Sequence, residues 1–242
     1  MGVIGCSDLA IDPSNSSIMY LATGDGDAGD TPSMGVLKTT NGGSTWAATS
    51  FTWAVSGGLM IRRLIVNPSN SQIVILASNA GIYRTTNGGT TWTQVASGST
   101  HDLEFKPGDP NTVYAGGSVF RISTNAGASF TTITNGIPST GINRMAIATT
   151  AADANYVYVL ASSSSNSGLQ GFYKSVASGT VFSQMTTTLN LLGWSSVGSD
   201  SGGQGWYDLC VASSPTNRDE VVTGGVNVWR TTIGGSTWSI FG

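Results

Sequence analysis

The chain has 242 residues, a formal net charge of −3 and only 10% charged residues, and 33 of its positions are glycine. Seven residues each of Phe, Trp and Tyr, together with the low charge, exclude an intrinsically disordered chain. The ten basic residues form no stripe, which excludes nucleic acid and anionic membranes as expected partners. No apolar run approaches the roughly 20 residues that a membrane span requires.

Four short strand patterns recur in each of five successive segments of the chain. The segments are residues 6–50, 61–98, 101–136, 142–188 and 206–242. The second pattern of each segment is a nearly continuous apolar run, such as residues 18–22 and 156–160. Such a run is expected of a strand that is buried on both faces. Because no stretch has apolar residues at the 3.6-residue period, we predict essentially no helix.

A glycine-rich hairpin that closes on an aromatic residue recurs between the third and fourth strand patterns. Its five copies are residues 39–46, 85–92, 123–130, 175–182 and 231–238. The closing aromatic residues are 46, 38, 52 and 56 positions apart, close to the period of about 40–50 residues of a four-stranded propeller blade. We therefore predict that residues 1–242 form one all-β domain, a β-propeller of five four-stranded antiparallel blades. These blades form either a closed ring of five or part of a larger ring.

The hairpin resembles the Asp-box, or BNR, repeat S/T-x-D-x-G-x-T-W. The copies at 39–46 and 85–92 match with Asn in place of Asp, the last copy has Ile233 there, and the other two keep mainly the glycine and the aromatic residue. Asp-boxes occur in sialidases, xyloglucan-active glycosidases, sortilin-type receptors and other secreted propellers. In that family the box is a structural hairpin away from the active site, so the resemblance implies a fold and no catalytic role.

Three further phrases, residues 24–30, 35–40 and 206–210, resemble secreted propeller modules of large bacterial surface proteins, including cargo of type IX secretion. This resemblance implies an extracellular or cell-surface location. The sorting domain of such cargo is not in this sequence, nor does a signal peptide precede the first strand pattern. We therefore expect the chain to be part of a longer polypeptide.

Charged residues of alternating sign precede the Leu or Met of each first strand. They are Asp8, Arg63, Asp102, Arg144 and Asp208. In a propeller the first strand is the innermost, so these side chains are expected near the axis, where neighbours of opposite charge form ion pairs. A closed ring of five would set Asp8 beside Asp208, and two adjacent carboxylates need a cation, a shared proton or water. A larger ring is the alternative.

An acidic insertion follows the second strand pattern of the first segment. Asp25, Asp27 and Asp30 stand among glycines within residues 24–30. Close carboxylates on a flexible loop suit Ca²⁺, which takes about 6–8 oxygen ligands. The alternative is a polar turn whose Asp side chains cap backbone amides. Both interpretations remain open from the sequence.

Aromatic residues mark two other insertions, which a propeller would place on the same face as the acidic one. The candidate ligand-binding residues are Phe51, Trp53, Trp194 and Asp200. Exposed Trp beside polar residues is how proteins stack sugar rings; the alternative is that these aromatic residues anchor the loops. For Trp206 and Tyr207, which open the last segment, we expect the anchoring role.

The two cysteines, Cys6 and Cys210, constitute neither a disulfide-rich scaffold nor a metal site. We expect two small buried apolar residues. A disulfide that joins the first and last blades is the alternative.

These observations favour a non-catalytic, extracellular binding or adhesion module for a glycan or a cell-surface protein, with calcium as a candidate cofactor. A sialidase is not supported, because the chain has only two Glu residues and lacks the arginine triad. A xyloglucan-active glycosidase is the first alternative, with Asp8 and Asp208 or Asp25 and Asp200 as candidate carboxylates. A structural propeller that binds a protein is the second. His101 has no nucleophile motif around it that would complete a catalytic triad.

Overall fold

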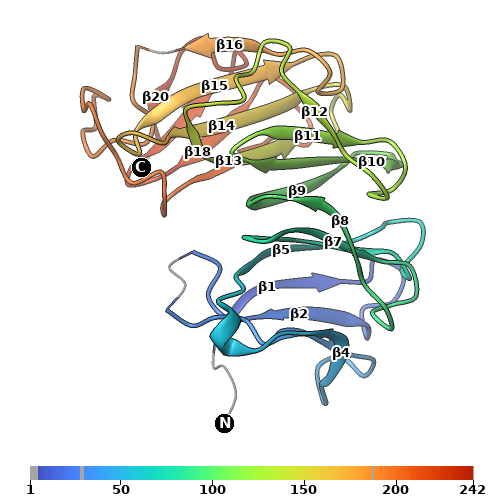
Figure 1. Ribbon diagram of the computed structural model, residues 1–242. Coiled ribbons are helices and arrows are strands. Elements are labelled where there is room, and N and C mark those ends of the chain that lie inside the picture. Colours follow the sequence, from blue (N-terminus) through green and yellow to red (C-terminus); the bar gives the residue numbers. More distant parts are fainter. Residues whose placement is uncertain (1–4, 28–29, 187, 242) are drawn as a thin grey trace. The chain divides into compact units, whose positions relative to one another are not determined.

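The computed structural model describes residues 5–27, 30–186 and 188–241. Within these ranges the chain is strand and turn throughout, apart from one 3-10 turn at Val55–Gly57 (Figure 1), so the expected absence of α-helix holds for them. None of these residues belongs to a helix of the length and apolarity needed to cross a bilayer. The contacts group the chain into two compact units. Unit 1 comprises Met1–Leu103 and Ser123–Phe130, and unit 2 comprises Glu104–Ile122 and Thr131–Gly242.

Unit 1 contains two complete four-stranded sheets with the orders β1-β2-β3-β4 and β5-β6-β7-β8. The strands of the first sheet are β1 (Cys6–Ile11), β2 (Met19–Thr23), β3 (Gly35–Thr39) and β4 (Ala47–Thr52). Those of the second sheet are β5 (Ile61–Val66), β6 (Val74–Ser78), β7 (Gly81–Thr85) and β8 (Thr93–Ser97). Consecutive strands pair antiparallel in both sheets.

The remaining three sheets have the same sequential order of strands. The third consists of β9 (Thr100–Lys106), β10 (Asp109–Gly117), β11 (Phe120–Ser123) and β12 (Thr131–Ile133). The fourth consists of β13 (Ile142–Thr149), β14 (Val157–Ser163), β15 (Leu169–Ser175) and β16 (Ser183–Thr186). The fifth consists of β17 (Cys210–Ser213), β18 (Val221–Gly224), β19 (Val228–Thr231) and β20 (Ser239–Ile240). The prediction of five four-stranded antiparallel sheets is confirmed.

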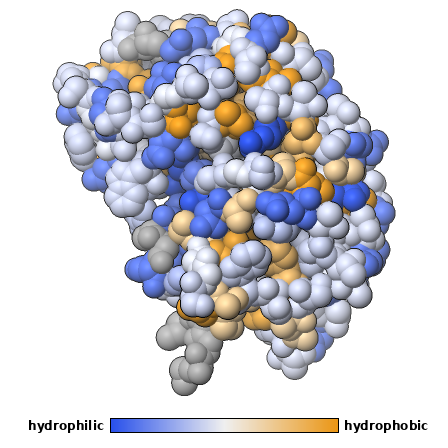
Figure 2. Space-filling model, in the orientation of Figure 1, coloured by the Kyte–Doolittle hydropathy of each residue, from blue (hydrophilic) through white to orange (hydrophobic). Residues whose placement is uncertain are grey.

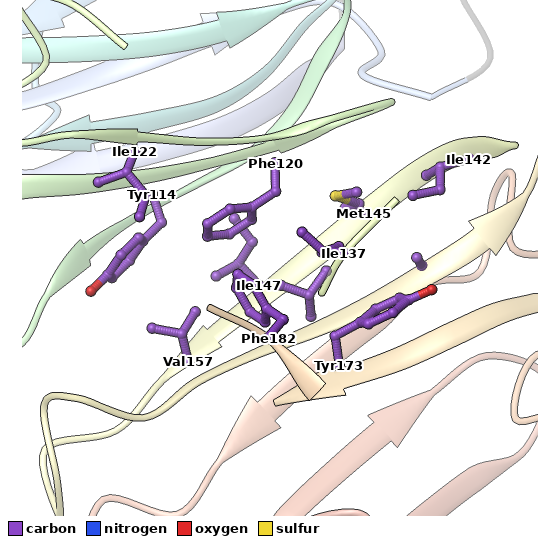
Figure 3. Close-up of a cluster of buried hydrophobic side chains, with 12 residues drawn as sticks. Tyr114, Phe120, Ile122, Ile137, Ile142, Met145, Ile147, Val157, Tyr173 and Phe182 are labelled. Atoms are coloured by element: carbon purple, nitrogen blue, oxygen red, sulfur yellow. The ribbon is translucent and has the colours of Figure 1, made fainter. Parts of the chain in front are cut away.

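The second strand of most sheets is the most deeply buried, as its apolar sequence predicts. Every residue of β6 is buried, and so are all residues of β14 except its last. The side chains on both faces of these strands pack against neighbouring sheets, which explains the absence of polar alternation. One resulting core of unit 2 includes Phe120, Ile147 and Phe182, whose side chains converge between strands of the third and fourth sheets (Figure 3).

A buried hydroxyl organises each of the five glycine hairpins. The first residue of every copy is Thr or Ser, and its oxygen accepts a hydrogen bond from the N–H of the glycine four positions later. The donor–acceptor distances are 3.1 Å for Gly43 and Thr39, 3.1 Å for Gly89 and Thr85, 2.9 Å for Gly127 and Ser123, 2.9 Å for Gly179 and Ser175, and 3.1 Å for Gly235 and Thr231. Because all five hydroxyls are buried, losing such a bond would leave a polar group unsatisfied.

An asparagine side chain closes three of the hairpins in the same way. The carbonyl oxygens of Asn41, Asn87 and Asn125 accept the N–H of the residue four positions on, at 2.9, 2.9 and 3.0 Å. Their amides donate to that residue's hydroxyl at 2.9 Å. The copy at 123–130 therefore keeps the asparagine function as well as the glycine and the aromatic residue, which makes it a closer match than the sequence comparison suggested.

Each hairpin packs against the sheet that precedes it in the chain. The closing aromatic residue meets an aromatic ring of that sheet edge to face: Trp92 lies 5.4 Å from Phe51, Phe182 lies 4.9 Å from Phe120, and Trp238 lies 4.9 Å from Phe172, between ring centroids. Such pairs add about 0.5–1.5 kcal/mol to the free energy of burial. The repeated hairpin is thus the joint between consecutive sheets.

The predicted row of alternating charges is bound partly by backbone groups. In unit 1, Arg63 Nε lies 3.5 Å from Asp102 Oδ1, and Asp8 Oδ2 accepts the N–H of Leu64 at 2.6 Å. In unit 2, Arg144 Nη1 donates to the carbonyl oxygens of Trp206 and Tyr207 at 3.3 and 3.0 Å. These side chains therefore fix neighbouring backbone segments as well as pairing with each other.

Both cysteines are exposed free thiols, each on the surface of its own unit. The expectation that they are small buried apolar residues is wrong. Cys6 and Cys210 lie at the outer ends of β1 and β17, which are the first strands of the first and last sheets. One face of each of these sheets is not covered by a neighbouring sheet, and this accounts for the exposure of strand positions that are buried in the middle sheets.

Candidate ligand-binding surface

The face of the molecule drawn in Figure 2 is predominantly polar, with hydrophobic residues in small separate patches. The described part of the chain nevertheless exposes several large aromatic side chains. Trp53 is exposed in unit 1, and Trp194, Trp206 and Tyr207 are exposed in unit 2. Exposed aromatic side chains held in fixed positions are candidates for ligand contact, because they present a large contact area at a small entropic cost.

Phe51 and Trp53 lie side by side at the end of β4. Phe51 is only 6% exposed and packs edge to face on Tyr83 and Trp92, with ring centroids 5.0 and 5.4 Å apart. It is a core residue at the joint between the first two sheets and is not accessible to a ligand. Trp53 stacks on Phe51 at 6.2 Å and packs against Gly57 of the 3-10 turn.

Trp194 is more exposed, at 52%, and is held at its polar edge. With the Gln204 amide turned to satisfy both neighbours, the Gln204 side-chain oxygen accepts the indole N–H at 3.1 Å. The amide nitrogen of Gln204 then donates to Asp208 Oδ2 at 2.7 Å. The Trp194 carbonyl accepts a bond of 3.1 Å from Asn227. The indole is thus fixed in position while much of its surface stays accessible.

Trp206 and Tyr207 lie beside the same glutamine. Each is 50% exposed, and their ring centroids are 5.4 Å apart at an interplanar angle of 43°. The N–H of Tyr207 donates to the Gln204 carbonyl at 2.8 Å, and Arg144 holds the carbonyls of both aromatic residues. The expectation that these two residues are buried anchors is wrong, because β17 begins at Cys210 and leaves them in the preceding turn.

We call Trp194, Trp206 and Tyr207 the aromatic surface of unit 2. Gln204 connects its parts, since its side chain binds Trp194 and Asp208 and its carbonyl binds the turn that carries Tyr207. The sequence contained one signal for this arrangement: the glycines at 202, 203 and 205 allow a tight turn directly before the aromatic pair.

Asp200 stabilises the loop beside Trp194. Its carboxylate accepts the N–H of Ser195, and its carbonyl accepts a 2.9 Å bond from Asn190 Nδ2. Asn190 and Asp200 also line an open hollow of about 250 Å³ together with Leu169, Thr188, Leu189, Gly198, Ser199 and Ser201. The carboxylate therefore shapes the wall of this hollow through a backbone contact.

The acidic loop of unit 1 contains an Asx turn. Asp25 Oδ1 accepts the N–H of Asp27 at 2.9 Å, and Arg62 Nε donates to the Gly26 carbonyl at 2.9 Å. These contacts agree with the capping interpretation. Asp30 is exposed, and residues 28 and 29 fall outside the described ranges. The described residues contain no group of three or more His, Cys, Asp or Glu that could hold a metal ion, and calcium stays a prediction.

The two carboxylate pairs considered for a glycosidase each divide between the units, since Asp8 and Asp25 belong to unit 1 and Asp200 and Asp208 to unit 2. Asp8 accepts backbone N–H groups from Leu9 and Leu64. Asp208 accepts the Gln204 amide, and Asp200 accepts Ser195. All three carboxylates thus take part in local structure.

Comparison with known proteins gives similarity at the level of structure. No family model matches the chain, and no curated protein is similar in sequence. An ancestral GH74 enzyme superposes with a TM-score of 0.74 at 20% identity, over 99% of this chain and 31% of that one. The GH74 xyloglucanase from Xanthomonas campestris gives a TM-score of 0.70 at 16% identity, over 99% of this chain and 38% of that one.

The chain therefore spans about a third of the length of these glycoside hydrolases. YCF48 bound to D1 peptide covers 99% of this chain and 84% of its own, with a TM-score of 0.52 at 14% identity. At such identities the similarity concerns the fold. Together with five meandering four-stranded sheets, it establishes that this chain has the β-propeller fold.

Proposed function

We propose that this chain is a non-catalytic, carbohydrate-binding propeller module of the Asp-box type, and that the aromatic surface of unit 2 is its binding site. The observation that carries the proposal is that Trp194, Trp206 and Tyr207 are half-exposed although hydrogen bonds fix their positions. A pre-organised aromatic surface loses little conformational entropy when a ligand binds. Sugar rings offer the flat C–H faces that stack on such rings.

Two further observations support a glycan ligand. The surface around the aromatic residues is built from Ser, Asn, Gln and Gly, so neutral hydroxyl groups find donors and acceptors beside the rings. Solved structures of similar fold include an enzyme described as a xyloglucanase. The absence of catalysis rests on the carboxylates of Asp200 and Asp208, which already accept hydrogen bonds from loop groups. On the composition and the Asp-box resemblance, we also propose an extracellular or cell-surface location within a longer polypeptide.

A glycan array followed by titration with xyloglucan oligosaccharides tests the proposal. Tryptophan fluorescence or calorimetry should detect binding that Trp194→Ala and Trp206→Ala each weaken by at least about tenfold, or about 1.4 kcal/mol. Trp53→Ala is the matched control, because it removes an exposed Trp from unit 1 and should leave the affinity unchanged. Repeating the titration with EDTA tests the calcium prediction separately.

Two results would overturn the assignment. Binding that is equally weakened by Trp53→Ala and Trp194→Ala would remove the aromatic surface as the site. Release of reducing sugar from xyloglucan by the unmodified chain, abolished by Asp208→Asn, would make the protein a glycosidase.

A protein ligand is the second candidate. YCF48, which shares the fold, has been solved bound to a peptide, and exposed Trp and Tyr are also enriched in protein interfaces. If no glycan binds, a peptide library displayed against the chain and against Trp194→Ala separates a protein ligand at this surface from none.

A further inference from the structure

One face of the first sheet is apolar and exposed. Leu9 and Ile11 of β1 are 45% and 49% exposed. Leu9 is paired with Leu21 of β2, which is paired with Leu37 of β3, so the three leucines stand side by side on one face. We call Leu9, Ile11, Leu21 and Leu37 the leucine face. The opposite face of the same strands carries Ala10, Tyr20 and Val36 and is buried against the second sheet.

The repeat identifies what normally covers such a face. Counted from the turn after each first strand and from the hairpin, the leucine face corresponds to positions 64, 66, 76 and 83 of the second sheet. Leu64, Val66 and Leu76 are buried, and all three belong to the core that contains Ala10, Tyr20 and Val36. A face of the leucine type therefore packs on a face of the Ala10, Tyr20 and Val36 type from the preceding sheet.

The first hairpin is uncovered in the same way. A Cβ on the last glycine of the later hairpins would lie close to atoms of the preceding sheet: 2.9 Å from Thr49 for Gly89, 2.4 Å from Ile75 for Gly127 and 2.5 Å from Phe172 for Gly235. A Cβ on Gly43 would meet only Trp46 of its own hairpin, no closer than 3.8 Å. The glycine fits a partner sheet that the described part of unit 1 does not supply.

The last sheet carries the complementary half of this joint. Its positions that correspond to Ala10, Tyr20 and Val36 are Ala212, Val222 and Val228, and Ala212 and Val228 are exposed. An open hollow of about 230 Å³ lies there, lined by Ala212, Ser213, Ser214, Glu220 and Val222. The smaller Val222 stands where the first sheet has the ring of Tyr20.

A cation completes the match. The residue directly before the hairpin donates to the next hairpin's turn in two joints: Lys38 Nζ to the Gly88 carbonyl at 2.9 Å, and Arg84 Nε to the Ala126 carbonyl at 2.8 Å. Arg230 holds this position in the last sheet, where it pairs with Glu220 of its own sheet. The carbonyl of Gly42 holds the corresponding acceptor position in the first hairpin.

We infer that the leucine face and first hairpin of one copy dock on the last sheet of a second copy of this chain, through the same joint that connects consecutive sheets. The contact is head to tail, so it extends to further copies or closes into a ring of copies. In it, Leu9, Leu21 and Trp46 cover Ala212, Val222 and Val228 of the second copy, and Arg230 of that copy reaches the turn at Gly42.

Sedimentation velocity of the whole chain between about 1 and 200 µM, in reducing buffer, tests the inference. We expect a mass above that of the monomer which rises with concentration, and loss of this rise in Leu9→Glu and in Arg230→Glu. Val197→Glu, at an exposed position on neither face, is the control and should assemble as the unmodified chain does. Circular dichroism and thermal melting confirm that each variant is folded.

A mixing experiment identifies the two surfaces. In a background of Cys6→Ser and Cys210→Ser, a copy with Trp46→Cys and a copy with Val228→Cys should form a mixed disulfide dimer. Copies with Trp46→Cys alone should not crosslink with each other. A monomeric mass at every concentration, or assembly that survives both charge variants, would overturn the inference and leave the glycan-binding proposal untouched.

Discussion

The Nε atom of Arg84 lies 2.8 Å from the carbonyl oxygen of Ala126, in the turn of the following hairpin. Burial lowers the pKa of the Arg84 guanidinium, yet the side chain is charged at every accessible pH and takes a backbone carbonyl as its partner. Arg84 therefore connects β7 of the second sheet to the hairpin at 123–130, and both belong to unit 1.

Arg84→Met should lower the free energy of unfolding by about 1.5–3 kcal/mol, because it removes a hydrogen bond from a charged donor while keeping an aliphatic stem. Urea unfolding followed by tryptophan fluorescence measures the change. Arg84→Lys should recover part of the loss, since the lysine at 38 serves the same purpose in the preceding joint. Equal loss in the Met and Lys variants would contradict this role of the charge.

Gly235→Ala should destabilise the chain more than Gly43→Ala does. Both glycines have left-handed backbone angles, φ +96° and +87°, so an alanine suffers similar backbone strain of about 1–2 kcal/mol at each. Only at Gly235 would the new Cβ also overlap a core ring, that of Phe172, at 2.5 Å. Overpacking should add about 1–3 kcal/mol.

The comparison of these two glycine variants is made on urea midpoints with a common m-value. An equal cost at both positions would mean that the hairpin's requirement for glycine comes from its own backbone. The joint between sheets would then contribute nothing to that requirement.

Stability should fall at acid pH through Asp109. The hydrogen bond from Thr112 Oγ1, at 2.7 Å, and the N–H of Asn111 hold the pKa of this carboxyl below its usual value. Because the folded pKa lies below the unfolded value of about 3.9, the stabilisation is present above that pH and is lost as the pH falls through the folded pKa. Urea midpoints of the unmodified chain and of Asp109→Asn should differ at pH 6 and converge below about pH 3. A difference that is independent of pH would exclude a contribution from ionisation.

Both thiols of the native chain should react with Ellman's reagent, since Cys6 and Cys210 are exposed and free. Burial raises the pKa of the Cys6 thiol, although its bond to the Asp8 carbonyl acts in the opposite direction. In the Cys210→Ser variant, Cys6 should therefore react more slowly than free cysteine at neutral pH, because the thiolate is the nucleophile. Its rate should increase steeply above pH 9. Failure of either thiol to react before unfolding would indicate that it is blocked.

The recurring hairpin was sufficient to predict the five sheets, because glycine, a hydroxyl residue and an aromatic residue at fixed spacing determine the turn locally. The continuous apolar runs likewise predicted which strands are buried on both faces. The sequence does not reveal that Gly127 and Gly235 each lie against a preceding sheet, since that contact joins residues about 50 or more positions apart in the chain. The prediction that residues 1–242 form one domain stays a prediction.

The aromatic surface was only partly foreseen. Trp194 was a candidate, whereas Trp206 and Tyr207 were assigned to the core because their apolar character continues into the strand pattern. Their exposure depends on where β17 begins, and the bond between Gln204 and Tyr207 determines this. Phe51 was a candidate because it lies in an insertion, but the neighbouring sheet covers it through Tyr83 and Trp92.

The joint between consecutive sheets has a direction: a hairpin always grips the sheet before it, and a cation from that sheet reaches forward. Every repeat thus carries both halves of the recognition within a single stretch of sequence. Duplication or deletion of one whole repeat would create a junction whose chemistry already exists, whereas a break inside a repeat would separate a hairpin from its strands. Such a chain is well suited to evolve in length by gain or loss of complete copies.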